Sequence, residues 1–278
     1  MATKLPVLNG HENGFGATQR QDTWWVGPAA VFAGLSAFLI YVNWAMFQAG
    51  HYYAEPYLSP FYSPVLFTHT PDVAGHAPLS MSWFGLWPDF WPEFLPASPA
   101  FLILIFPASF RFTCYYYRKA YYRAFVGSPP GCAVGPMAGG KKKYNGETAF
   151  LLFQNLHRYA LYFALAFILL LGHDAWIACW RGDQFGVGVG TIVLTLNVVF
   201  LGGYTMGCHS FRHLIGGRDD CMSCGKDTVK YGAWKRVSWL NARHQIFAWT
   251  SLFWVGFSDL YVRLVSMEII TDYNTWDM

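Results

Sequence analysis

Five apolar stretches, each close to the length needed to cross a lipid bilayer, are the feature that most constrains this chain. A transmembrane helix takes about 20 predominantly apolar residues. The candidate spans cover residues 24–49, 99–125, 148–173, 187–213 and 234–264. Charged residues make up 13% of the sequence, about half the roughly 25% of a soluble domain. A soluble chain so poor in charge would expose large apolar patches and associate. We therefore predict an all-α integral membrane protein with five transmembrane helices in a bundle.

The segments around the spans predict the topology. Residues 1–23 form an N-terminal tail, residues 24–264 the five-helix membrane domain and residues 265–278 a C-terminal tail. Loops rich in Lys and Arg stay in the cytoplasm. Of the 19 Lys and Arg residues, all but Arg181 and Arg263 fall in the N-terminal tail or around the loops after the second and fourth spans. We expect a cytoplasmic N-terminus and an outer C-terminus.

The long connection between the first two spans has an unusual composition. Residues 50–98 are rich in Pro and aromatic residues and contain no Lys or Arg. The prolines preclude a long helix, so we expect an outer loop that lies on the membrane face or caps the bundle. Within the second span, Pro107 predicts a kink.

Metal-ligand side chains recur at one depth in four of the predicted helices. A helix rises about 1.5 Å per residue, which places each of them roughly 12–17 Å from the cytoplasmic end of its helix. These side chains are Cys114, His157, Cys208 and His244, with His209 and His213 as alternative ligands. Any one histidine alone fits an ordinary core residue, but ionisable groups within lipid-spanning helices are costly and usually mark a site. We predict a metal site in the bundle core, with ligands that project inward from facing helices.

Two Cys and two His are compatible with more than one metal group. They are the ligands of a Rieske-type [2Fe–2S] cluster, and zinc accepts the same set. A b-type haem held by two histidines is a third option, with the cysteines as packing residues. A helical bundle in lipid does not need zinc to fold, and haem needs no sulfur. The two cysteines at the level of the histidines therefore favour the cluster, and haem b is the alternative.

Two further stretches have more than one interpretation. The loop Cys221-Met-Ser-Cys224 could complete a zinc site with His209 and His213, although a single CxxC is a weak pattern. We expect no structural disulfide on the cytoplasmic side, where this loop is predicted to lie. A basic, tyrosine-rich run follows Cys114 and contains Arg118, Lys119 and Arg123. It could anchor the helix at the membrane interface, or attract an acidic soluble partner.

Several long motifs resemble a known family. They read FRFTCYYYRKAYYRAF, QNLHRY, GCHSFRH, LNARHQ and, earlier in the chain, YLSPFYSP. From about Trp24 to Asp272 the chain resembles the single, cytochrome b-like, five-helix membrane-anchor subunit of the actinobacterial type of succinate dehydrogenase, a respiratory complex II. The loop with Cys221 and Cys224 is not part of the family pattern.

The resemblance implies a complex in the bacterial plasma membrane. Its partners would be a flavoprotein subunit, which carries FAD and oxidises succinate, and an iron–sulfur subunit with further clusters, both on the cytoplasmic side. The anchor would have no succinate site and would pass electrons to a quinone, menaquinone or ubiquinone. The outer level offers only His173 and loop histidines, which fits a single redox centre on the inner side. No nucleic acid partner is expected, and a higher oligomer of the complex is left open.

A quinone needs a flat apolar slot and donors for its carbonyl oxygens. Donors near the predicted cytoplasmic end are Trp25, Tyr117, Arg118, Ser210, His213 and Arg243. A different hypothesis is a proton-coupled transporter in which interior histidines relay protons. It predicts paired acidic residues within the spans, which contain almost none apart from Asp259 near the outer end.

Overall fold

The structure is a computed structural model that describes residues 18–69, 74–137, 148–217, Cys221, Cys224 and 229–276. The chain forms two compact units. The first consists of Met1–Ala37 and Phe112–Gln154, and the second of Phe38–Arg111 and Asn155–Met278.

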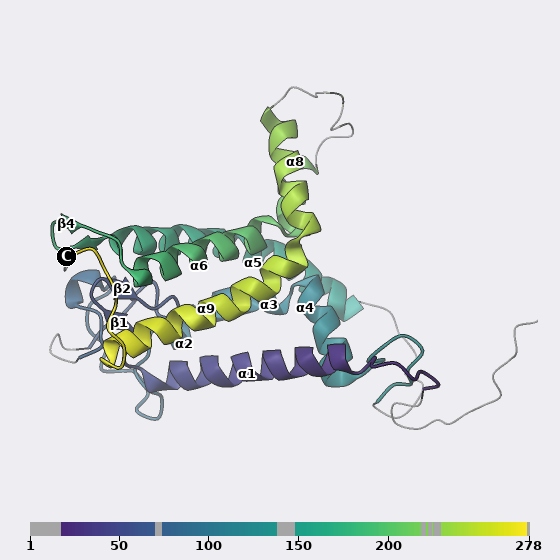
Figure 1. Cartoon of the computed structure of the whole chain (residues 1–278), viewed down its shortest axis with the longest axis horizontal. Helices are drawn as coiled ribbons and strands as arrows, with labels where there is room; N and C mark the ends of the chain where they lie inside the picture. The colour runs from purple at the N-terminus through teal and green to yellow at the C-terminus, as the bar shows by residue number, and fades with distance from the viewer. Residues whose placement is uncertain are drawn as a thin grey trace, which may run out of the picture. The chain divides into compact units, whose positions relative to one another are not determined.

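Helices account for most of the described residues (Figure 1). The longer helices are α1 (Val26–Gln48), α5 (Thr148–Ile177), α6 (Val189–Met206), α8 (Val229–Ala242) and α9 (His244–Ser266). The shorter ones are α2 (Ala100–Ile103), α3 (Ile105–Phe112), α4 (Tyr115–Ala120), the π-helix η2 (Tyr121–Val126), α7 (His209–Gly216) and the 3₁₀ turn η1 (Leu79–Met81). Two antiparallel two-residue hairpins pair β1 (Tyr53–Ala54) with β2 (Tyr57–Leu58), and β3 (Trp180–Arg181) with β4 (Gln184–Phe185).

Three helices in the described part of the chain are long and apolar enough to cross a membrane. They are α1, the segment Asn155–Ile177 of α5, and α6; a fourth span results if α2–α3 and α4–η2 together form one broken span. The prediction of a helical membrane protein is confirmed. The count of five stays a prediction, because α9 has the length but carries Asp259 and Arg263 and is less apolar.

Three of the predicted continuous spans are interrupted. In the second, the chain breaks at Leu104 and again at Thr113–Cys114. The first break has a physical cause, because Pro107 has no N–H to donate to the carbonyl of Ile103. The fourth span stops at Met206 and resumes two residues later as α7, and the fifth is divided at Arg243 into α8 and α9. Figure 1 shows α8 turning away from α9 at this junction.

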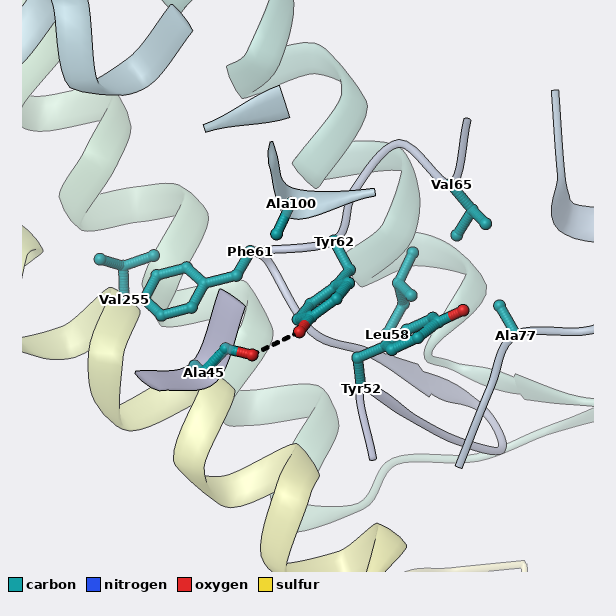
Figure 2. Close-up of a cluster of buried hydrophobic side chains, with 9 residues drawn as sticks. All are labelled: Ala45, Tyr52, Leu58, Phe61, Tyr62, Val65, Ala77, Ala100 and Val255. Carbon is teal, nitrogen blue, oxygen red and sulfur yellow. Dashed lines mark hydrogen bonds between the residues drawn. The ribbon is translucent and has the colours of Figure 1, made fainter. Parts of the chain in front are cut away.

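The Pro- and aromatic-rich connection is a packed part of the second unit. Its side chains form a buried cluster with Ala45 of α1, Ala100 of α2 and Val255 of α9 (Figure 2). The rings of Tyr52 and Tyr62 stack with their centroids 4.3 Å apart, and the Tyr62 hydroxyl donates to the carbonyl of Ala45 at 2.6 Å. As predicted, the described residues of this connection contain no long helix.

The segment after α9 is tied back to the start of α6. The Asp272 carboxylate accepts hydrogen bonds from the Tyr57 hydroxyl at 2.6 Å and from the backbone N–H of Gly190 at 2.9 Å. This satisfies one of the N–H groups that a helix leaves open at its N-terminus. Burial, reinforced by the bond to Asp272, raises the pKa of Tyr57, so the hydroxyl stays protonated and donates. A side chain on Gly190 would collide with the Tyr57 ring, 2.6 Å from the position of its Cβ.

A buried ion pair lies within α9. Asp259 and Arg263, one turn apart, are joined at 3.4 Å between the carboxylate Oδ2 and the guanidinium Nε. The carboxylate also accepts from the hydroxyls of Tyr41, at 2.6 Å, and Ser59. Arg263 donates to the carbonyl of Gly50 at 2.8 Å. The single acidic residue within the predicted spans is therefore held by a fixed cation and two hydroxyls, which does not favour a proton-relay role.

Removal of one partner of this pair should destabilise the protein strongly. In Arg263→Met the Asp259 carboxylate stays buried without its cation, and breaking a buried pair in this way costs about 3–5 kcal/mol. We expect a loss of that size in the free energy of unfolding, measured by titration with a denaturing detergent in mixed micelles. The double variant Asp259→Leu/Arg263→Met should lose less, because it leaves no isolated charge.

The control for this experiment is Glu268→Gln, which removes one exposed charge just after α9. It should leave the free energy of unfolding unchanged within about 0.5 kcal/mol. An Arg263→Met protein as stable as the control would contradict the assignment of the pair as a structural lock.

Candidate functional site

The four predicted ligands are all buried. The exposed fractions are 2% for Cys114, 8% for His157, 1% for Cys208 and 2% for His244. The two alternative ligands, His209 and His213, are exposed. His157, Cys208 and His244 belong to the second unit and Cys114 to the first.

The two cysteines occupy the same local conformation. Cys208 is the extended N-terminal cap of α7, with φ −73° and ψ 155°, and Cys114 is the extended cap of α4, with φ −66° and ψ 133°. The Cys208 Sγ accepts the backbone N–H of Phe211 at 3.2 Å. The N–H groups at a helix N-terminus stabilise negative charge, so the Cys208 position suits a thiolate ligand.

His157 lies on α5 with its ring against α3. The ring stacks on Phe110 with the centroids 4.4 Å apart and the planes 11° from parallel. The imidazole also makes a hydrogen bond with the backbone of Phe110. One residue of α3 therefore supports the face of the ring and fixes one of its edges.

His244, the first residue of α9, has an equivalent support from α6. Its ring stacks on Tyr204 at 4.9 Å between centroids and 15° between planes, and it makes a hydrogen bond with the Tyr204 backbone. A Cβ on Gly207 would lie 3.3 Å from Nδ1 of this histidine, so the glycine leaves space beside that nitrogen. Both His157 and His209 lie near enough to His244 to interact with it electrostatically.

An aromatic contact connects the two supported histidines. Phe110 and Tyr204 meet edge to face with centroids 5.4 Å apart. The resulting row of rings runs from His157 through Phe110 and Tyr204 to His244. It places two of the predicted ligands at the ends of one row of rings within the second unit, and one face of each imidazole is covered by an aromatic ring.

A cation that the sequence reasoning missed lies on this row. The Arg111 guanidinium is 4.6 Å from the centroid of the Tyr204 ring. It donates to the carbonyl of Ala248 at 3.1 Å and to the hydroxyl of Ser251 at 2.9 Å. An arginine inside an apolar span is a functional signal in its own right. That signal was present in the FRFTC motif.

The ligand set can be compared with what a metal requires. Among the described residues, no group of three or more His, Cys, Asp or Glu side chains converges on one point in the structure. The chemistry of the donors nevertheless fits a Cys/His-ligated group. Metal-binding histidines almost always donate their second ring nitrogen to a carbonyl or carboxylate, and both His157 and His244 have such a backbone bond.

The predicted common depth of the four ligands was calculated from the rise per residue of a helix, and it needs one correction. It assumed continuous helices, whereas Cys114, Cys208 and His244 lie at interruptions. For these three residues, the distance from the cytoplasmic end of a continuous helix therefore does not give the depth. His157 alone lies within an unbroken helix.

The predicted quinone donors are divided between the two units. Trp25, Tyr117 and Arg118 belong to the first, and Ser210, His213 and Arg243 to the second. Tyr117 is buried, whereas Trp25, His213 and Arg243 are exposed. Arg118 lines a pocket on α4, and Arg243 lies over the Trp239 ring at 4.0 Å.

The loop with the CxxC pattern differs from expectation. Cys221 and Cys224 form a disulfide with a Cα–Cα distance of 5.5 Å. Zinc binds thiolates, so in this oxidised form the two sulfurs cannot complete a site with His209 and His213. The expectation of no structural disulfide at this loop is wrong in this structure.

Comparisons with known proteins identify the family. The family model described as "Actinobacterial succinate dehydrogenase subunit SdhC" matches residues 26–268. Among solved structures, a chain of the "Mycobacterium smegmatis Sdh1 complex in the apo form" is 42% identical, with a TM-score of 0.79 and 92% of each chain covered. No curated protein matches. Both matches confirm the resemblance carried by the sequence motifs, and the chain belongs to the family of actinobacterial succinate dehydrogenase membrane subunits.

Proposed function

We propose that this chain is the electron-transferring, quinone-reducing anchor of its succinate dehydrogenase, and that Cys114, His157, Cys208 and His244 hold a Rieske-type [2Fe–2S] cluster. Membership of the family makes it a subunit of an oxidoreductase. The cluster is proposed from the residues themselves.

One observation carries the proposal: interruptions of the apolar helices coincide with candidate ligands. The helices break at Cys114, at Cys208 and immediately before His244. Irregular backbone at membrane depth is tolerated only where protein buries it or where it lines a cavity. Three breaks that each carry a buried sulfur or imidazole are therefore more economically explained by a shared ligand role than by packing.

The contacts around His157 and His244 also favour a ligand role for these two histidines. In each case one side of the imidazole is held by a backbone contact and one face by an aromatic ring. Such outer contacts fix the tautomer and orientation of a ligand before the metal binds. His157 and His244 would thus be pre-organised ligands.

When bound, a cluster of this type takes up and releases one electron at a potential raised by its imidazole ligands. Side chains of this protein would provide the surroundings of the cluster. Phe110 and Tyr204 keep water from the ligand rings, and Arg111 places a fixed positive charge beside Tyr204 and His244. A cation near a redox centre favours its reduced form, which suits a carrier that receives electrons from a soluble subunit.

We infer the remaining features of the anchor from the family and from α9. This helix has 23 residues, about 34 Å at 1.5 Å per residue, and pairs its Asp259 and Arg263 internally. It is thus long enough and sufficiently neutralised to be a fifth span. We propose a cytoplasmic N-terminus, association there with the FAD-containing flavoprotein and the iron–sulfur subunit, and quinone reduction with donors drawn from the predicted set. That set consists of Trp25, Tyr117, Arg118, Ser210, His213 and Arg243.

Replacement of either buried cysteine should abolish the metal centre. In the purified complex, we expect Cys114→Ser and Cys208→Ser to lose the EPR signal of low average g together with the matching iron and labile sulfide. Succinate–quinone reductase activity should fall by more than about 100-fold, beyond the 10–100-fold typical of outer-sphere partners. Succinate oxidation with an artificial acceptor at the flavoprotein should persist.

The matched control is Cys179→Ser, which changes a half-buried cysteine just after α5 and should keep both signal and activity. A pyridine haemochrome assay on the same samples tests the alternative. Stoichiometric haem b that survives both cysteine substitutions would exclude the cluster and leave the anchor role intact.

Neutralisation of Arg111 should change the potential without removing the centre. We expect Arg111→Gln to retain the EPR signal but to shift its midpoint potential downward by about 60 mV, which is tenfold for a one-electron couple. Quinone reduction should slow, with little change in the KM for succinate. The comparison variant is Arg181→Gln, at β3, whose potential should equal that of the wild type; an unchanged potential in Arg111→Gln would contradict the electrostatic role.

A further inference from the structure

A basic pocket in the first unit shares Arg118 with the predicted quinone donors, but its other two cations have no part in the proposed electron transfer. It has a volume of about 250 Å³ and lies between α4, η2 and the loop that follows. Its lining consists of Tyr115, Arg118, Lys119, Tyr122, Arg123, Ser128, Pro129, Gly131 and Cys132. Three of these side chains are cations.

The pocket is built by one face of a helical segment and a folded-back loop. Tyr115, Arg118, Lys119, Tyr122 and Arg123 follow the three- and four-residue spacing that places side chains on one face of a helix. The loop returns at Gly127, which has a left-handed φ of 58°. A side chain there would also meet Met137, 2.8 Å from its Cβ.

The N-terminal segment holds the far wall of the pocket in place. The Arg20 guanidinium donates to the carbonyl of Cys132 at 2.9 Å, and the Thr18 hydroxyl donates to the carbonyl of Ala133 at 2.8 Å. The loop is therefore fixed opposite the basic face by contacts from a distant part of the same unit.

Cations outnumber acidic side chains among the described residues of this unit. The one acidic side chain among residues 18–37 and 112–137 is Asp22, and it is paired with Arg20. Lys119 and Arg123 are four residues apart on the helix, a spacing at which like charges repel. Three cations around one pocket create a positive potential that attracts an anionic ligand.

The surroundings of the pocket indicate what kind of anion it takes. Large side chains on the same helical segment are exposed: Tyr115 by 55%, Phe125 by 43% and Val126 by 40%. Tyrosines beside basic residues are typical of the membrane interface, where a headgroup phosphate and acyl chains meet. A pocket of about 250 Å³ is smaller than the roughly 300–1,000 Å³ of drug-sized sites, so it suits one headgroup.

We propose that this pocket binds the phosphate of an anionic phospholipid, with Arg118, Lys119 and Arg123 as the phosphate ligands and Tyr115 and Tyr122 at the boundary with the acyl chains. Basic pockets next to transmembrane helices bind such headgroups by charge-assisted hydrogen bonds. The inference is independent of the metal centre.

Native mass spectrometry of the delipidated, detergent-solubilised complex tests the proposal, with short-chain phosphatidylglycerol as the probe. Wild type should retain the lipid, and Lys119→Gln/Arg123→Gln should bind it roughly 25-fold more weakly, since each basic residue near an anionic lipid is worth roughly fivefold. Phosphatidylcholine, with the same acyl chains and no net charge, should bind weakly to both. Succinate oxidation with an artificial acceptor and the EPR signal should match the wild type in the double variant, which verifies that it is folded.

The control variant Lys230→Gln/Lys235→Gln removes two charges from α8 and should retain phosphatidylglycerol. Equal losses in both double variants would show general attraction and overturn the pocket as a site. Displacement of the lipid by inorganic phosphate at equal concentration would overturn the lipid as the occupant in favour of a free anion. Loss of the flavoprotein and iron–sulfur subunits from Lys119→Gln/Arg123→Gln would assign the pocket to protein docking instead.

Discussion

A helix that crosses a bilayer has to satisfy its own backbone hydrogen bonds, and the rest of this structure depends on how that constraint is met where helices are interrupted. At the break after α6, the Asn241 amide donates to the carbonyl of Gly207 at 2.8 Å, and the Cys208 sulfur takes the N–H of Phe211. Arg111 supplies a donor to the carbonyl of Ala248 near the start of α9. At the break between α6 and α7, one open carbonyl is thus satisfied by a side chain of α8 and one open N–H by the capping residue of α7 itself.

Two glycines of this region allow α6 and α9 to pack closely where α9 begins. Gly203 and Gly207 are one turn apart, and a Cβ on Gly203 would lie 2.5 Å from the Phe247 ring. Small residues at this spacing let helix backbones approach in a membrane. The close approach positions His244 against Tyr204, so helix packing and the support of a candidate ligand depend on the same two glycines.

Composition alone was enough to predict the long apolar helices. It was not enough to predict where helices are interrupted, because contacts between distant residues determine the breaks. Apolar length identified α1, α5 and α6, because lipid selects for it directly. The breaks at Cys114, Cys208 and Arg243 were not predicted, since these residues are compatible with a helix and the interruption reflects tertiary partners. Five spans and the inner location of the centre stay predictions.

In the candidate site, too, the sequence was sufficient to select residues but not to predict their contacts. Residue type and approximate depth selected four side chains that are all buried. Spacing along one helix cannot reveal that Phe110 supports His157 or that Tyr204 supports His244, because each pair joins different helices. Arg111 was visible as a charge within an apolar run. Its contacts with Tyr204 and Ser251, however, require the folded chain.

The bond between Gly190 and Asp272 also bears on the order of assembly. It joins residues 82 positions apart, and Asp272 follows α9 in the chain. During synthesis, the first turn of α6 is made while this N–H is still unpaired, and the carboxylate that accepts it is added only after α9. Contacts of long sequence separation are slow to form, so this bond can close only when the chain is complete through α9.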